Sequence, residues 1–166
     1  MSVNREYKNS VFSYLFGQPD TLRELYGALR GVEVPADVKI EINTLQDALF
    51  LDRINDLSFA IGKILVILIE HQSTINPNMA VRLLMYIARI YEKILGGENI
   101  YSGKHLTLPR PECIVLYNGT APYPDTQTIR LSDSFEQAEL PGLPRGTPAV
   151  ELTAKIYNIN EGRNPE

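Results

Sequence analysis

Two carboxylates and an amide stand at a spacing that could hold a metal ion. Asp56 begins a stretch in which apolar and polar residues alternate, Glu70 directly follows six apolar residues, and Gln72 comes two positions later. The dipeptide Gly62-Lys63 between the two stretches is a turn signal. If the stretches form an antiparallel hairpin centred near Lys63, Asp56 lies almost opposite Glu70, and Gln72 faces the same side of the strand as Glu70. The pattern predicts a row of Asp56, Glu70 and Gln72.

This row has the chemistry of a magnesium site. Side chains opposed across a strand pair are ~5 Å apart at Cβ, so the two carboxylates could share one cation. Asp56, Glu70 and the backbone carbonyl of His71, completed by water, are the oxygen ligands that Mg²⁺ or Mn²⁺ prefers. A cation held in this way can activate water and relieve phosphate charge during phosphodiester hydrolysis. Gln72 could orient the attacking water.

A structural alternative needs no metal. Asp56 would cap a turn after Asn55, and Glu70 would form a salt bridge with Arg82 on the following helix. An unpaired charge at the end of a buried strand is costly, which favours a functional role for Glu70. The spacing alone leaves both interpretations open.

Hydrophobic periodicity predicts the elements that would position these residues. Helices are expected at 5–16, 20–30 and 77–95. Strands are expected at 44–51, 56–61, 64–70, 113–117 and 150–159. The proline-rich segment 119–148 is expected to be an irregular loop. This order predicts an α/β fold with a mixed central sheet flanked by helices, in which an antiparallel hairpin precedes a helical crossover.

Individual residues mark the ends and faces of these elements. Asp20 is expected to cap the second helix and Gly31 to end it, and Asn76-Pro77 is expected to begin the third helix. The buried stripe of the third helix is expected at Leu83, Leu84, Ile87, Ile90 and Ile94. The last strand is expected to place Val150, Leu152, Ala154, Ile156 and Asn158 on one face.

The composition is that of an ordinary globular domain. The chain has 166 residues, of which 44% are hydrophobic and 22% charged, so we expect one domain across 1–166. The net charge of −4 argues against a protein that coats nucleic acid through bulk positive charge, but it does not exclude a nuclease. No run approaches the ~20 apolar residues of a membrane helix, and the N-terminus lacks the apolar core of a secretory signal. The single Cys113 favours a reducing compartment, so we expect a cytoplasmic protein with no membrane partner.

Longer segments of the sequence are similar to a known family. They are KNSVFSYLFG (8–17), NDLSF (55–59), ILIEHQSTINPNMAVRLLMYIARIYEKIL (67–95), PECIVLYNGT (111–120) and ELTAKIYNIN (151–160). Across essentially the whole chain they resemble the recombination-promoting nuclease (Rpn) family, also known as the PD-(D/E)XK nuclease family transposases. The run EHQS followed by an R-x3-Y helix is specific to that group.

The resemblance implies a restriction-endonuclease-like PD-(D/E)XK core, a divalent-metal site and DNA cleavage linked to recombination. By position it assigns the first Asp of the motif to Asp56, here preceded by Asn55 rather than proline, and the second acid to Glu70. The usual lysine falls on Gln72, which offers hydrogen bonds where lysine would offer positive charge. Relatives usually continue past the point where this chain ends, so we expect a longer parent protein whose C-terminal part is missing here.

Four further residues could contact DNA or the metal. Arg82 and Tyr86 lie on one side of the third predicted helix, where Arg82 could reach a phosphate or Glu70; the alternative is a solvated basic face. Lys8 could contact a DNA phosphate or be plain surface charge. Glu24 on the second helix could be an extra acid of the metal site or an ordinary exposed glutamate.

The leading interpretation is a Mg²⁺-dependent endodeoxyribonuclease of low sequence specificity, because no recognition element such as a zinc finger is visible. A first alternative is a catalytically weak or inactive module of the same fold that binds nucleic acid or a protein partner, which the acidic net charge and Gln72 favour. A second alternative is an interaction module that forms a homo-oligomer through the helix at 78–95 and the terminal strand.

Overall fold

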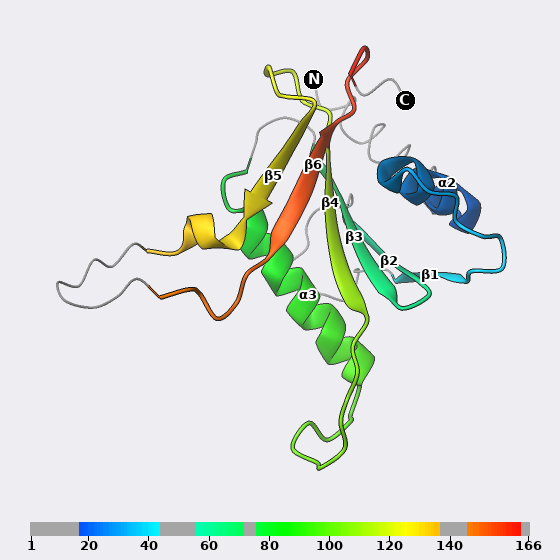
Figure 1. The fold of residues 1–166 in the computed structure, drawn as a ribbon, viewed down its shortest axis with the longest axis vertical. Coiled ribbons are helices and arrows are strands. Elements are labelled where there is room, and N and C mark those ends of the chain that lie inside the picture. The colour runs from blue at the N-terminus through cyan, green and yellow to red at the C-terminus, as the bar shows by residue number, and fades with distance from the viewer. Residues whose placement is uncertain (1–16, 44–55, 72–75, 137–145, 164–166) are drawn as a thin grey trace, which may run out of the picture.

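The computed structural model describes residues 17–43, 56–71, 76–136 and 146–163 (Figure 1). The helices in these ranges are α2 (Pro19–Arg30), α3 (Met79–Leu95) and the short 3-10 helix η2 (Leu131–Ser134). The strands are β1 (Ile40–Asn43), β2 (Asp56–Ile61), β3 (Ile64–His71), β4 (Arg110–Tyr117), β5 (Thr126–Arg130) and β6 (Thr153–Asn158). None of the helices in the described ranges has the length and apolar character needed to span a membrane.

The strands form one mixed sheet in the order β1-β2-β3-β4-β6-β5. Strands β1, β2 and β3 are antiparallel neighbours, β3, β4 and β6 are parallel to one another, and β5 is antiparallel to β6. Helix α3 carries the chain from the end of β3 back to the start of β4, as a parallel pair requires. The expected α/β class, with its hairpin and helical crossover, is confirmed, and the arrangement is compatible with a restriction-endonuclease-like core.

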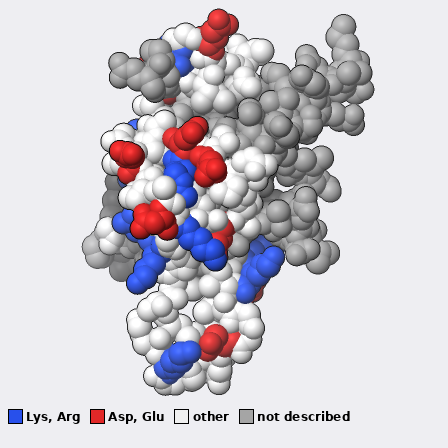
Figure 2. Space-filling view, turned by 90° about the vertical axis from the view of Figure 1, so that its right-hand side faces the viewer, with Lys and Arg blue, Asp and Glu red and all other residues white. Residues whose placement is uncertain are grey.

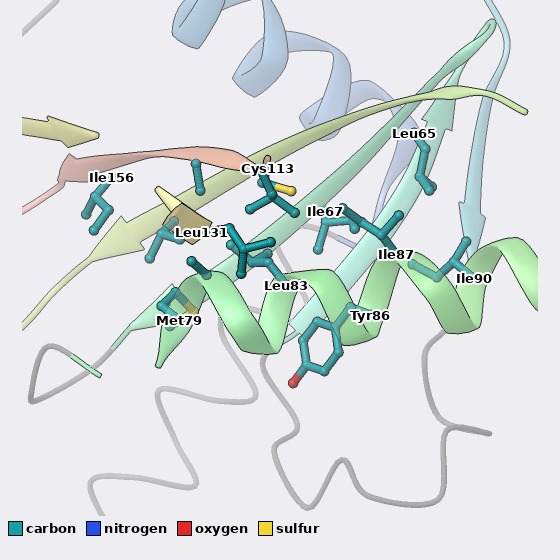
Figure 3. Packing of buried hydrophobic residues seen from close by; sticks show 14 of the residues in the cluster. Leu65, Ile67, Met79, Leu83, Tyr86, Ile87, Ile90, Cys113, Leu131 and Ile156 are labelled. Carbon is teal, nitrogen blue, oxygen red and sulfur yellow. The ribbon is translucent and has the colours of Figure 1, made fainter. Parts of the chain in front are cut away.

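Strand β3 supplies side chains to a hydrophobic core on each face of the sheet. Leu65 and Ile67 pack in the core that contains α3, whereas Val66 packs in the core that contains α2. Figure 3 shows Leu83 and Ile87 of α3 directed toward the strands. Because both faces of the sheet are covered, β3 has an unbroken apolar sequence instead of an alternating one.

One largely buried carboxylate ties α2 to the sheet. Glu112 of β4, whose side chain is 10% exposed, accepts hydrogen bonds from the Tyr26 hydroxyl (2.9 Å) and from the Arg30 guanidinium. Arg110 donates to its other oxygen at 2.9 Å. Burial alone would raise the pKa of Glu112, but the hydrogen bonds from Arg30 and Tyr26 and the two guanidinium charges outweigh it and hold that pKa below its ordinary value. The sequence did not indicate this cluster.

Helix α2 begins slightly earlier than expected. Gln18 is its N-cap and Pro19 its first residue, where the missing N–H of proline breaks no hydrogen bond. Asp20 is therefore not the N-cap; it lies in the first turn, where its charge complements the helix dipole. The expected end at Gly31 is confirmed, with a φ of 63° in the left-handed region that glycine tolerates.

Helix α3 begins later than expected. Asn78 is its N-cap, so Asn76 and Pro77 precede the helix instead of starting it. The reason is a local turn in which Asn76 Oδ1 accepts the backbone N–H of Asn78 at 2.9 Å. This side-chain bond competes with the helical pattern and delays it by two residues.

Two apolar residues expected on buried faces are exposed. Ile94 lies in the last turn of α3, and Val150 lies before β6 begins, so the paired part of the sheet does not cover Val150. Leu84 is half-buried against the core. The remaining expected positions are buried: Leu83, Ile87, Ile90, Leu152, Ala154, Ile156 and Asn158.

Two strands lie where none was expected. β1 occupies 40–43, while the expected strand at 44–51 and the expected helix at 5–16 lie outside the described residues. β5 and η2 fall within 119–148, so the expectation of an irregular loop is wrong for that part. β5 pairs on one side only among the described strands and is mostly exposed, so it lacks the alternation that marks a half-buried strand.

Replacing Glu112 by glutamine should lower the free energy of unfolding at pH 7 by about 1–2 kcal/mol, because charge-assisted hydrogen bonds to a partly exposed arginine are lost. The folded-state pKa of Glu112 lies below the unfolded value. Its stabilisation is therefore full above the unfolded pKa of ~4.3 and is lost as the pH falls through the folded pKa. Urea unfolding of wild type and Glu112→Gln at pH 7 and pH 3 measures both effects.

Glu41→Gln is the matched control, because Glu41 forms an exposed ion pair with Lys39. We expect it to change the free energy of unfolding by less than about 0.5 kcal/mol at either pH. Equal losses in the two variants, or a Glu112→Gln effect that persists undiminished at pH 3, would contradict this account of the cluster.

Candidate metal site

The β2–β3 hairpin brings the backbones of Asp56 and Glu70 to one end of the sheet. β2 begins at Asp56, and β3, which is antiparallel to it, ends at His71. A φ of 57° at Gly62 suits the tight turn that joins them. The expected antiparallel hairpin is confirmed. Because β3, β4 and β6 are parallel, the ends of all three strands lie together at this end of the sheet.

The register of the hairpin differs by one residue from the expected one. The turn consists of Gly62 and Lys63 together, so the hairpin is centred between them and not on Lys63. Asp56 therefore pairs with Ile69 and not with Glu70. In regular paired strands a shift of one residue changes the face of the sheet. A cation shared by Asp56 and Glu70 therefore requires the strands to depart from regular geometry at this end of the hairpin.

The described part of the structure does not include the side chains that would complete the site. These are the side chains of Asp56 and Glu70, and the whole of Gln72; Lys8 is also outside the described residues. Chelation of one ion by the two acids and the His71 carbonyl therefore stays a prediction. Among the side chains that are described, no group of three or more His, Cys, Asp or Glu residues could hold a metal ion.

A polar network braces the same end of the sheet. Asn158, the last residue of β6, is buried and donates from Nδ2 to the carbonyl oxygen of Tyr123 at 2.9 Å. Its Oδ1 accepts the backbone N–H of Asn160 at 3.1 Å, and Asn160 Nδ2 donates to the carbonyl of Gly119 at 2.9 Å. These bonds hold the segments that follow β4 and β6 against each other.

Tyr117 fixes the segment that follows β4. Its backbone pairs with that of His71 at the end of β3, and its hydroxyl donates to the carbonyl of Ala121 at 2.8 Å. Its ring centroid lies 4.5 Å from that of Tyr123. A Cβ on Gly119 would lie 2.5 Å from the Tyr117 hydroxyl oxygen, so only glycine lets the chain pass this close to the ring. The strand ends beside the candidate site are therefore held in a packed, hydrogen-bonded arrangement.

Arg82 and Tyr86 contact each other on the first turns of α3. Arg82 Nε donates to the Tyr86 hydroxyl at 2.7 Å, and the guanidinium lies 5.3 Å from the ring centroid. Tyr86, labelled in Figure 3, is buried and belongs to the hydrophobic core that contains α3. The expected neighbourhood at i and i+4 is confirmed. Contact of Arg82 with a phosphate or with Glu70 stays a prediction.

Glu24 lies on the exposed side of α2, whereas Leu22 and Tyr26 of the same helix are buried against the sheet. Its role as an extra acid stays a prediction.

Cys113 is a free, buried thiol whose pKa is raised to about 12, first by burial and then by the charge of Glu112. A thiol in this state is unreactive and serves as a small apolar side chain.

A family model matches the chain across residues 32–158, well over half of its length. The family is described as "Putative transposase, YhgA-like". The chain belongs to this family. It is a family of the PD-(D/E)XK transposase, or Rpn, type, as the resemblance of the sequence indicated. No curated protein and no solved structure matches the chain significantly.

Membership of the YhgA-like transposase family gives the chain a DNA-processing function of the nuclease type and implies contact with DNA. The matched range contains Asp56, Glu70 and Gln72, together with the hairpin that carries the two acids. It also contains the polar network at the ends of β4 and β6.

Gly119→Ala should destabilise the fold, because the new methyl group would overlap the Tyr117 ring against which the segment is packed. We expect a loss of about 1–3 kcal/mol in the free energy of unfolding, which is typical of overpacking. Gly103→Ala is the control, because the space around Gly103 is open. Urea unfolding of both variants measures the difference. Equal free energies of unfolding would show that the segment after β4 can shift to make room for the methyl group without loss of stability.

Proposed function

We propose that the chain is a Mg²⁺- or Mn²⁺-dependent endodeoxyribonuclease that hydrolyses phosphodiester bonds with low sequence specificity during DNA recombination. One observation carries the proposal. In a chain of the YhgA-like transposase family, the β2–β3 hairpin brings Asp56 and Glu70 to the same end of the sheet. This is where the PD-(D/E)XK motif needs its two acids. DNA is proposed as the substrate because the chain belongs to a transposase family.

The chain's own groups fit a hard divalent cation. Asp56 and Glu70 would provide carboxylate oxygens and His71 a backbone carbonyl, which together form the oxygen donor set that Mg²⁺ and Mn²⁺ favour. A cation bound there supplies positive charge that lowers the pKa of water and neutralises charge on the phosphate. The network around Asn158 and Tyr117 keeps the neighbouring strand ends in place, and these would give the site a fixed support.

Gln72 would act on the attacking water through hydrogen bonds. Its side chain offers one acceptor oxygen and two N–H donors, but no charge. The carboxamide oxygen would accept a hydrogen bond from the water and so direct its lone pair toward phosphorus. The lysine that is usual at this position in the superfamily would add positive charge near the phosphate. Without it, stabilisation of the phosphate charge would depend on the cation that Asp56 and Glu70 would hold.

A second candidate is a catalytically weak or inactive module of the same fold that binds nucleic acid or a protein partner. Two features of the sequence favour it: the net charge of −4 and the uncharged Gln72. The intact pair of Asp56 and Glu70 favours the nuclease. Activity measured on purified protein separates the two.

Asp56→Ala should abolish nicking of supercoiled plasmid in Mg²⁺ or Mn²⁺, because one metal ligand is lost. Gln72→Ala should lower the initial rate on the order of 10²-fold, the cost of removing one well-placed polar group from an active site. Gln72→Lys should keep or raise the rate, because it restores the charged residue. Initial rates at equal folded fraction and saturating Mn²⁺ measure all three variants.

Asp133→Ala is the control, because Asp133 is an exposed acid of η2 outside the proposed site, and it should nick at the wild-type rate. Wild-type rates in Gln72→Ala would remove Gln72 from the site and leave a two-carboxylate centre. An inactive wild type would instead support the binding module, whereas nicking that survives Asp56→Ala would show that the activity does not depend on the proposed metal site.

A further inference from the structure

The segment 96–109, which joins α3 to β4, projects beyond the end of the sheet (Figure 1). We call this segment the finger. Two large apolar side chains lie at its tip: Ile100 is 60% exposed and Tyr101 is 91% exposed. Apolar groups held out in water suggest a contact that covers them.

The finger has a fixed conformation of its own. The backbone N–H of Ser102 donates to the carbonyl of Asn99 and that of Tyr101 donates to Asn99 Oδ1, both at 3.0 Å. Lys104 closes the turn through an ion pair with Glu98 at 3.3 Å. The tip therefore presents Ile100 and Tyr101 from a hydrogen-bonded turn, and little conformational entropy would be lost when they bind.

The base of the finger is attached to the sheet. The backbone N–H of Arg110 donates to the carbonyl of Lys63 at 3.0 Å, and the Tyr91 hydroxyl donates to the carbonyl of Pro109 at 2.6 Å. These bonds set the position of the finger relative to the β2–β3 hairpin. A ligand that touches the tip is thereby placed in a defined position relative to the whole domain.

Three cationic side chains lie on the finger or where it joins the sheet, although the chain as a whole is acidic. Lys63 lies at the hairpin turn, Arg110 begins β4 and Lys104 lies on the finger, and all three are exposed. Lys104 is paired with Glu98 and Arg110 with the largely buried Glu112, but the cationic side chains themselves are 66% and 70% exposed, so that N–H groups not used in these pairs could donate to a phosphate. Figure 2 shows Lys and Arg side chains interspersed with Asp and Glu on the body, next to a projecting part that is mostly uncharged.

We propose that the finger is a wedge that enters the minor groove of duplex DNA, with Ile100 and Tyr101 against the bases and Lys63, Lys104 and Arg110 on the flanking phosphates. Short apolar wedges flanked by cations are how many proteins hold the minor groove without reading sequence. A second protein chain fits less well, because a stable protein interface buries ~800 Å² per partner and two side chains cannot supply this. The cations match the charge of a polyanion.

The position of the finger agrees with the proposed nuclease, on which this inference rests for its substrate. The finger meets the sheet beside Lys63, at the start of β3, whereas Glu70 lies at the other end of that strand. At ~3.3 Å per residue the two ends of β3 are roughly 25 Å apart. The finger extends beyond this end of the sheet (Figure 1), so a duplex that touches its tip and the acids must span more than this distance, as a duplex of about two turns (~68 Å) does.

Fluorescence anisotropy with a fluorescein-labelled 20-base-pair duplex in EDTA tests the wedge without cleavage. Tyr101→Ala should weaken binding about tenfold at every salt concentration, because a base contact of one aromatic ring is lost. Its plot of log K against log[salt] should keep the wild-type slope. Lys63→Ala should reduce the magnitude of that slope by about 1, because one phosphate contact is lost.

Phe135→Ala is the matched control, because Phe135 is another exposed aromatic residue, located after η2 and outside the finger. It should bind DNA as wild type does. Tyr101→Ala binding within twofold of wild type would overturn the wedge. A second result would also overturn the wedge: Tyr101→Ala binds DNA as wild type does but sediments as a smaller species. The finger would then join two copies of the chain.

Plasmid nicking by the same preparations in Mn²⁺ separates this inference from the proposed function. Wild type that nicks, together with unchanged DNA affinity in Tyr101→Ala, would overturn the wedge alone. Binding that depends on Tyr101 in a protein that does not nick would overturn the nuclease alone and support the wedge.

Discussion

The double burial of β3 is the constraint on which the rest of the fold depends. This strand is paired on both edges, to β2 and to β4. Its successive residues Leu65 and Val66 point to opposite faces of the sheet and belong to different hydrophobic cores. Such a strand requires a helix on each face, which α2 and α3 provide. Its middle can carry no charge, so the polar chemistry of this domain gathers where the strand begins and where it ends.

The two ends of the sheet carry different polar groups. At the start of β3 and β4, Lys63 and Arg110 are joined by a backbone hydrogen bond, and Arg110 pairs with Glu112, whose contacts with Arg30 hold α2 in place. At the other end, neutral amide and tyrosine hydrogen bonds lock the strand ends next to the backbones of Asp56 and Glu70. Uncharged hydrogen-bonding groups suit the neighbourhood of a site with two carboxylates and a cation, because they neither form ion pairs with the carboxylates nor repel the cation. Under the two proposals made above, one end would bind DNA and the other would cleave it.

The hairpin could be predicted because alternation in β2, the apolar run of β3 and the turn Gly62-Lys63 are all local signals. Its register could not, because the sequence does not say whether the turn is centred on one residue or between two, and that choice moves Asp56 by one position. β5 was missed because exposed edge strands lack a hydrophobic pattern. The contact of Glu112 with Arg30 joins residues 82 positions apart, which only the folded chain reveals. The spacing alone left open whether Asp56 and Glu70 bind a metal or have a structural role, and it was the resemblance to the Rpn family that favoured the metal site.

The central claim is that Asp56 and Glu70 share one divalent cation despite the offset in their backbone register. Titration of Mn²⁺ followed by the electron paramagnetic resonance signal of the free ion tests it most directly. The account predicts saturable binding in wild type that is lost both in Asp56→Ala and in Glu70→Ala, with the fold of each variant verified by circular dichroism. Saturable binding that survives either substitution, or a folded wild type that binds no Mn²⁺, would contradict it.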